Sequence, residues 1–239
     1  MKVIDYKKVS IDNIIFKEPV KTSNGCRIVR TYYNHNKEEI PIYIQTPKLK
    51  NLVDIKLNDD VSYIELELDK NHINFYEFIN SIDDNNISKT HSKSEKWFNK
   101  KLPMDVIDDF YKTNIKMKKY NKSPIIKFKI PVDSKNNKTC DVFGDNLIPI
   151  QLSEIKKDME VICILELQGI KFFKQRFETE WNIVQLRTYS KNLKKECLIN
   201  ESFLSDYEDI EDNEIIEDND EEENKTKNIE IKINSQAET

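Results

Sequence analysis

Hydrophobic and polar residues alternate along several stretches of the first 190 positions, at the period of a half-buried β-strand. The alternation is clearest in residues 61–69, where Ile64, Leu66 and Leu68 are predicted to face a core. Weaker alternation predicts further strands over residues 11–16, 26–33, 40–46, 124–132 and 140–143. The chain is therefore predicted to be built mainly from β-strands.

The period changes in two places to that of an amphipathic helix. Residues 71–82 carry apolar side chains at helical spacing. Residues 103–112 start with a proline, carry acids early and end with a lysine, as the first turn and the dipole of a helix favour. The polar residues 83–94 between them are predicted to form a loop. The predicted fold class is mainly β with a few helices (α+β).

One predicted hairpin carries the strongest functional signal. A strand over residues 161–167 reaches Gly169, and a second strand over 181–189 returns after a segment rich in rings and cations. Strict alternation on the second strand puts Val184 and Leu186 on one face. It puts four ring-bearing or polar residues on the other face: Trp181, Gln185, Arg187 and Tyr189. Such a face suits the stacking of unpaired bases beside phosphate-binding cations. The alternative is a second buried face, with the tryptophan in the core.

Three further segments combine aromatic rings with cations. The first comprises Lys171, Phe172, Phe173, Lys174 and Arg176. Because neighbours in a strand point to opposite faces, one of its phenylalanines must look away from the core, to stack on a base or to enter a second cluster. The second segment, a flap over nucleic acid or a helix anchor, comprises Trp97, Phe98, Lys100 and Lys101. The third, a phosphate track or a solvated surface, runs from Lys116 to Lys122 and includes Lys119, Tyr120 and Lys122. On the strand that follows, Lys127 and Lys129 are predicted to line the face away from the core, and with the face of Arg187 they would form a groove.

The formal net charge of −5 hides a strong division along the chain. Residues 1–200 hold 35 Lys and Arg against 28 Asp and Glu, a net charge of +7, and residues 201–239 have a net charge of −12. A basic body with an acidic tail favours work on nucleic acid. Acids without bases fill residues 201–224, which therefore cannot fold alone and suit docking on a basic surface.

The composition argues against an enzyme. The chain has three glycines, so neither a phosphate-binding P-loop nor a dinucleotide fingerprint can be formed. Its three histidines and four cysteines are scattered, without the spacing of metal ligands. No nucleophile motif is present, and no apolar run approaches 18 residues. We therefore expect no catalytic activity, no cofactor, no metal and no membrane partner, in an intracellular protein with reduced thiols.

Several motifs between residues 90 and 190 occur in the order found in a known family. An aromatic and basic patch is followed by Phe110-Tyr111, by KSPIIKFKIP at residues 122–131, by LQGIKF at 167–172 and by EWNIVQ at 180–185. This pattern resembles the single-stranded DNA-binding proteins of nucleocytoplasmic large DNA viruses. Those proteins are similar to the OB-fold single-stranded DNA-binding protein of short-tailed coliphages.

The resemblance implies an OB-fold-like five-stranded barrel with insertions in residues 1–200, and a largely disordered acidic tail in residues 201–239. It implies sequence-independent binding of single-stranded DNA in viral DNA replication, repair or recombination. The tail would compete with DNA and recruit replication proteins, and a homodimer is a further candidate assembly. The expected location is the host cytoplasm (viral factory) or nucleus, or the virion. Residues 225–239 depart from the coliphage pattern, in which the acidic stretch ends on a terminal aromatic residue.

A second hypothesis gives the tail the working role. The chain would then be an acidic-tailed interaction scaffold or a chaperone for basic proteins, and its β-domain would only carry the tail. The two hypotheses differ in what the basic body does, because a scaffold body would not bind single-stranded DNA at moderate salt.

Overall fold

The computed structural model describes residues 1–23, 25–55, 62–118, 123–132 and 139–189. The chain divides into two units, of which the first, Met1–Leu193, is compact. All described residues belong to the first unit. The predicted disordered tail, residues 201–239, lies outside them.

Five strands close into a barrel at the centre of the fold. They are β6 (Leu49–Asn51), β7 (Ser62–Glu67), β10 (Ile125–Ile130), β12 (Glu160–Phe172) and β13 (Phe177–Tyr189). β12 pairs with β6, β6 with β7, β7 with β10, β10 with β13, and β13 returns to β12. The β10–β13 pairing is parallel and the others are antiparallel. This ring confirms the predicted mainly β fold with an OB-like five-stranded barrel.

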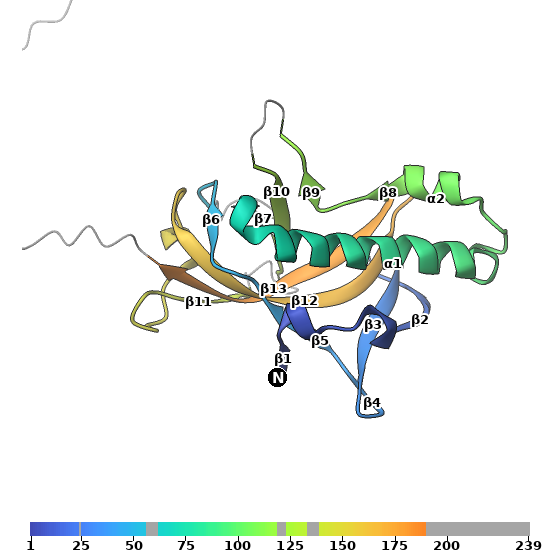
Figure 1. Ribbon diagram of the computed structural model, residues 1–239, viewed down its shortest axis with the longest axis horizontal. Helices are drawn as coiled ribbons and strands as arrows, with labels where there is room; N and C mark the ends of the chain where they lie inside the picture. The colour runs from blue at the N-terminus through green and yellow to red at the C-terminus, as the bar shows by residue number, and fades with distance from the viewer. Residues whose placement is uncertain (24, 56–61, 119–122, 133–138, 190–239) are drawn as a thin grey trace, which may run out of the picture. The chain divides into compact units, whose positions relative to one another are not determined.

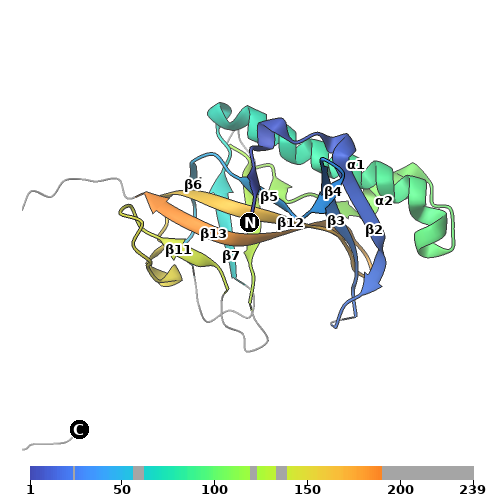
Figure 2. The ribbon, with the colours of Figure 1, turned by 90° about the horizontal axis from the view of Figure 1, so that it is seen from below.

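β12 is the strand on which the rest of the sheet is assembled. One edge pairs with β13 along its length. The other edge pairs in turn with β6, with β5 (Ile42–Gln45) and with β3 (Arg27–His35). Figure 2 shows the long β12–β13 hairpin extending past the barrel toward β2 and β3. The hairpin therefore has one end in the barrel and the other in this extension.

Shorter strands and helical turns attach to this frame. β2 (Ile14–Lys21), β3 and β4 (Glu38–Ile40) form an antiparallel meander, and β1 (Val3–Ile4) runs parallel to β5. β8 (Tyr111–Lys112) and β11 (Asp141–Phe143) pair with β13, and β9 (Ile115–Lys116) pairs with β10. The 3₁₀ turns are η1 (Tyr6–Lys8), η2 (Ile11–Asn13), η3 (Lys70–His72) and η4 (Leu152–Glu154).

Most of the buried apolar side chains form one core inside the barrel. The predicted inward residues of two barrel strands are all buried: Ile64, Leu66, Leu68, Ile126, Phe128 and Ile130. A second cluster joins the end of the β12–β13 hairpin to the helices and contains Val29, Trp97, Ile107, Ile170 and Phe177. The two clusters show that the hairpin is packed along its inner face from one end to the other.

Helix α1 (Ile73–Phe98) is more than twice as long as predicted, and runs across the barrel in Figure 1. The predicted loop over residues 83–94 is wrong, because these residues continue the helix. Its buried face goes on past Ile82, but with polar residues: Asp83, Asn86, Thr90 and Ser94. A pattern search based on apolar spacing cannot detect such a face. The helix predicted over 103–112 is confirmed as α2 (Met104–Phe110).

A buried hydrogen-bond network holds the polar middle of α1 on the barrel. The Asp83 carboxylate accepts from the hydroxyls of Tyr111, Thr113 and Thr179. Asn86 Nδ2 donates to Thr179 Oγ1 at 2.9 Å. Burial raises the pKa of the Asp83 carboxyl above its ordinary range, although the three hydroxyl donors act in the opposite direction. The network therefore supplies hydrogen-bond partners to Asp83 and Asn86, two of the buried polar residues of this helix.

Both strands of the central hairpin are 13 residues long, so the ring-rich segment predicted to connect them is largely strand. The strands carry two bulges, where the register shifts between Ile164 and Leu165 and between Leu167 and Gly169. At the first bulge, Ile164 pairs with Gln185 and Leu165 with Ile183, so Val184 is the extra residue. An extra residue reverses the alternation of faces beyond it.

This bulge corrects the predicted face of β13. Trp181 and Ile183 are buried on one side of the bulge. Gln185, Arg187 and Tyr189 point outward on the other side, as predicted, and are only partly covered. The prediction that Trp181 shares their face is wrong, because strict alternation does not continue through the extra residue.

Candidate nucleic-acid interface

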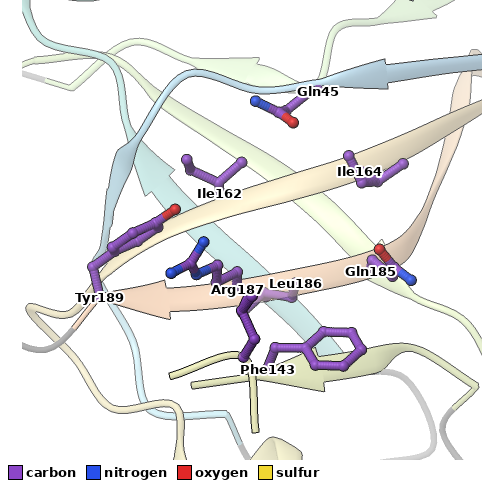
Figure 3. A pocket seen from close by; sticks show the side chains of 9 residues that line it. Gln45, Phe143, Ile162, Ile164, Gln185, Leu186, Arg187 and Tyr189 are labelled. Carbon is purple, nitrogen blue, oxygen red and sulfur yellow. The ribbon is translucent and has the colours of Figure 1, made fainter. Parts of the chain in front are cut away.

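A groove of about 560 Å³ lies on the outer face of β12 and β13, at the barrel end of the hairpin. Its lining residues come from β5, β11, β12, β13 and the loop after β11: Gln45, Phe143, Leu147, Ile162, Ile164, Gln185, Leu186, Arg187 and Tyr189. Figure 3 shows the side chains of Arg187 and Tyr189 rising from β13 beside Ile162 of β12. We call this hollow the ribbon groove.

The ribbon groove combines the Tyr189 ring with Arg187, and a second cation, Lys48, reaches the same ring from outside the groove lining. The Arg187 guanidinium carbon lies 4.8 Å from the centroid of the Tyr189 ring, and Lys48 Nζ lies 4.2 Å from it. Arg187 Nη2 also donates to the carbonyl of Asp145 at 2.7 Å, which fixes the position of the guanidinium. Rings held beside cations are the elements that bind bases and phosphates of single strands.

One donor in the ribbon groove has no acceptor. Arg187 Nε is buried and makes no hydrogen bond to any described residue. A buried donor of this kind loses its hydration without replacement, at a cost of about 1–3 kcal/mol. The planar guanidinium of Arg187 is a group that suits phosphate oxygens.

The loop after β11 gives the ribbon groove an apolar lip. Leu147 and Ile148 are 62% and 60% exposed. Backbone hydrogen bonds from Gly144 N to Ile148 O (2.9 Å) and from Leu147 N to Gly144 O (3.1 Å) hold the loop in a tight turn. Leu147 has a φ of 59°, which is uncommon for a leucine. The turn therefore holds large apolar side chains out toward solvent at the groove.

Sequence reasoning missed the groove residues outside β13. Ile162 and Ile164 alternate with the buried Val161, Cys163 and Leu165, so β12 is apolar on both faces at this end. That run was a signal that the outer face is partly covered. No local pattern indicates Gln45, Phe143 or Leu147, which tertiary pairing brings to the groove.

A polar cleft of about 170 Å³ follows farther along the same face of the hairpin. It is lined by Thr22, Ser23, Ile28, Arg30, Gln168, Lys171, Glu180 and Asn182. The Glu180 carboxylate lies 2.9 Å from Lys171 Nζ and 3.9 Å from Lys129 Nζ. On the neighbouring strands Lys127 Nζ lies 3.1 Å from Glu65. Lys127, Lys129 and Lys171 do lie on the outer face, but each has a carboxylate beside it, which weakens the positive potential there.

The tip of the hairpin brings two predicted segments together. Trp97 and Phe98 of α1 contact the Phe172 ring, with centroid distances of 6.1 and 5.2 Å. Trp97 is buried, which agrees with the alternative of a helix anchor and contradicts the alternative of a flap over nucleic acid. Phe173 lies at the turn, where the Arg176 guanidinium is 4.5 Å and Lys171 Nζ 5.5 Å from its centroid.

The remaining predicted residues fall into three groups. Lys100, Lys101, Lys174 and Arg176 are exposed. Trp181 is 2% exposed and its ring meets Phe128 edge-on inside the barrel, so it is not available for stacking. Lys119, Tyr120 and Lys122 lie outside the described residues. The predicted residues that share a hollow form two sets: Gln185, Arg187 and Tyr189 in the ribbon groove, and Phe98, Phe172, Phe173, Lys174 and Arg176 in a second hollow at the tip of the hairpin.

The described part of the chain contains no group of three or more His, Cys, Asp or Glu residues placed to hold a metal ion. No helix in the described ranges is long and apolar enough to cross a membrane.

Comparison with known proteins gives a family and several structural likenesses. The model of a family of unknown function (DUF5871) matches residues 53–206. The chain belongs to this family. The matched range covers four of the five barrel strands and both helices of this chain. No curated protein sequence matches the chain.

Among solved structures, this chain is similar to two phage proteins. One is gp2.5, the single-stranded DNA-binding protein encoded by bacteriophage T7, with a TM-score of 0.46, 9% identity, 66% of this chain covered and 98% of that chain. The other is the single-stranded DNA-binding protein from bacteriophage Enc34, with a TM-score of 0.42 and 11% identity. The match covers 80% of this chain and 99% of the Enc34 chain. A structure of the Enc34 protein in complex with single-stranded DNA is similar at a TM-score of 0.40 and 11% identity. The match covers 72% of this chain and 94% of that chain. The predicted origin in a large DNA virus stays a prediction.

Proposed function

We propose that the chain binds single-stranded DNA without sequence preference and without catalysis, along the outer face of β12 and β13. The observation that carries the proposal is the ribbon groove, in which Arg187 has an unsatisfied buried donor beside the Tyr189 ring. Phosphate would complete the hydrogen bonds of the guanidinium, and a base would lie on the ring.

The rest of the face suits an unpaired strand. The side-chain amides of Gln45 and Gln185 line the groove and make no hydrogen bond to another described residue, so they are open to base edges. Apolar contacts from Ile162 and Ile164 do not discriminate between bases. The basic residues of the body supply a general attraction for phosphate, since residues 1–200 have a net charge of +7. Indiscriminate capture of single strands supports a role in DNA replication, repair or recombination.

The groove is tested with the variant Tyr189→Ala. Loss of one stacked base is worth about 1–3 kcal/mol, so the dissociation constant for fluorescently labelled oligo-dT should rise about 5- to 150-fold. Arg187→Gln should also weaken binding and reduce the slope of log K against log salt by about one. The measurement is anisotropy at two or more salt concentrations.

Tyr32→Ala is the matched control. Tyr32 is a partly exposed tyrosine with Lys17 Nζ 5.6 Å from its ring centroid, and it does not line the ribbon groove. Loss of the Tyr32 ring should leave the dissociation constant for oligo-dT within about twofold of the wild-type value, because only a ring that stacks on a base contributes to affinity in this way. Equal effects of Tyr32→Ala and Tyr189→Ala would contradict the groove. A wild-type chain that does not bind oligo-dT at moderate salt would favour the scaffold hypothesis.

We also propose that the acidic tail regulates this binding and recruits replication proteins. The proposal comes from charge, because residues 201–239 have a net charge of −12 and can compete with phosphate for the basic body. Removal of residues 201–239 should raise the affinity for oligo-dT, and the gain should shrink at high salt because screening weakens the competition. A titration that shows no gain, or a gain independent of salt, would exclude competition.

A further inference from the structure

A second hollow lies at the tip of the hairpin, away from the ribbon groove. It has a volume of about 290 Å³ and is bounded by α1, α2 and the hairpin turn. Its lining is mainly apolar: Thr90, Phe98, Leu102, Val106, Ile107, Phe110, Phe172, Phe173, Lys174, Arg176 and Phe177. We call it the tip pocket.

The apolar surface of the tip pocket extends to the outside of the molecule. Phe110 lines the pocket and is 46% exposed, and Met104 on the same helix is 44% exposed. Phe98, Phe172 and Phe173 are only partly covered. A concave group of large, incompletely covered apolar side chains is typical of a place where another apolar group docks.

The rings of the tip pocket are arranged for a side chain rather than for a nucleobase. Phe172 packs face to face with Phe177 at 5.3 Å and 23°, and it meets Phe98 edge-on at 72°. The faces of these rings are therefore engaged within the protein. Apart from Thr90, the polar lining residues are cations, so the pocket offers few partners for the edges of a base.

The positive charge at the rim of the tip pocket favours an acidic partner. Both charged lining residues are cations, Lys174 and Arg176, and Lys174 is exposed. Arg176 already contacts Glu178 at 3.1 Å, which leaves Lys174 as the stronger attraction for an acid. Asp105, Asp108 and Asp109 of α2 are exposed and do not line the pocket. An acidic segment would gain from this rim, and a basic one would be repelled.

We infer that the tip pocket is a docking site for an acidic peptide segment of a partner protein, which inserts a large apolar side chain. The anchor would contact Phe110, Leu102 and Val106, and the flanking carboxylates would meet Lys174 and Arg176. An anchor buried in a pocket with a charged rim is the usual arrangement of a binding hot spot. The inference does not rest on DNA binding, because it uses different residues at the other end of the hairpin.

The test uses the full chain and a labelled synthetic peptide that mixes acids with Phe, Leu, Tyr and Ile in a sequence not taken from this chain. Anisotropy should show saturable binding. Lys174→Glu and Phe110→Ser should each weaken it at least about tenfold, because they remove the rim charge and the exposed apolar wall. Lys116→Glu reverses an exposed lysine outside the pocket and should have no comparable effect.

Two further arms identify the source of binding. A peptide with its apolar residues changed to serine keeps its charge and should not bind, and this arm does not depend on the folding of any variant. Saturating oligo-dT should not displace the original peptide, and Phe110→Ser, which leaves the charge of the body unchanged and lies outside the ribbon groove, should bind oligo-dT like the wild type. The inference is overturned if the peptide does not bind the wild type or if the serine peptide binds equally well. It is also overturned if Lys174→Glu and Phe110→Ser bind the peptide as tightly as the wild type does, or if oligo-dT displaces the peptide.

Discussion

Gly169→Ala is expected to prevent the β12–β13 hairpin from docking on β3, with a loss of more than about 4 kcal/mol in the free energy of unfolding or a loss of soluble protein. A Cβ atom at this position would lie 1.9 Å from the carbonyl oxygen of Val29 and 3.1 Å from Arg30 Cα. Both are backbone atoms of a paired strand, so no side-chain rotation relieves the overlap. The φ of 131° adds a second penalty for any residue with a side chain.

Chemical denaturation followed by circular dichroism measures this effect, and Gly144→Ala is the matched control. A Cβ at Gly144 would lie 3.5 Å from a side-chain carbon of Ile150, an ordinary contact. Its free energy of unfolding should stay within about 1 kcal/mol of the wild type. If Gly169→Ala were as stable as Gly144→Ala, the close approach of β12 to β3 would be wrong.

Trp181→Ala is expected to lower the free energy of unfolding by about 3–5 kcal/mol, and to leave the DNA affinity of the folded protein unchanged. Trp181 is 2% exposed and its ring centroid lies 6.3 Å from that of Phe128 in the barrel core. Removal of the ring leaves a cavity between strands that cannot collapse freely, because the barrel is closed.

Trp181→Phe separates the volume of the ring from its polar atom. The indole Nε1 is buried without a hydrogen-bond partner among the described residues. Phenylalanine removes this unsatisfied donor together with part of the volume, so its cost should be well below that of alanine. Denaturation and oligo-dT titration on the same samples give both readouts. A Trp181→Ala protein that keeps its stability but loses DNA binding would place the ring on the DNA-binding face.

Alternation along the sequence was sufficient to predict the barrel strands that have one buried and one polar face. Ile64 and Leu66 of β7 and Phe128 of β10 point inward as predicted, because a period of two is a direct consequence of strand geometry. The same rule failed at Val184, where one extra residue moves Trp181 to the core face. Nothing in the local sequence marks that bulge.

The helix and the groove escaped prediction for different physical reasons. The second half of α1 buries Asp83 and Asn86, whose partners come from strands distant in sequence, so its helical period is invisible in hydrophobicity. The ribbon groove needs Gln45 and Phe143, which reach it only through pairing with β12 and β13. Sequence patterns predicted the β13 side of the groove, and tertiary structure supplied the opposite wall.

The pairing of β12 with strands from the first quarter of the chain has a consequence for the order of assembly. Lys171 pairs with Ile28 and Leu165 with Ile44, so these ladders join segments more than one hundred residues apart. During synthesis on a ribosome, the early strands emerge long before the strand that completes them. Closing such long loops slows folding, and the waiting strand edges are open to pairing with other chains in the meantime. A chaperone that shields β3 and β5 during translation would therefore act at the stage when the chain is most open to aggregation.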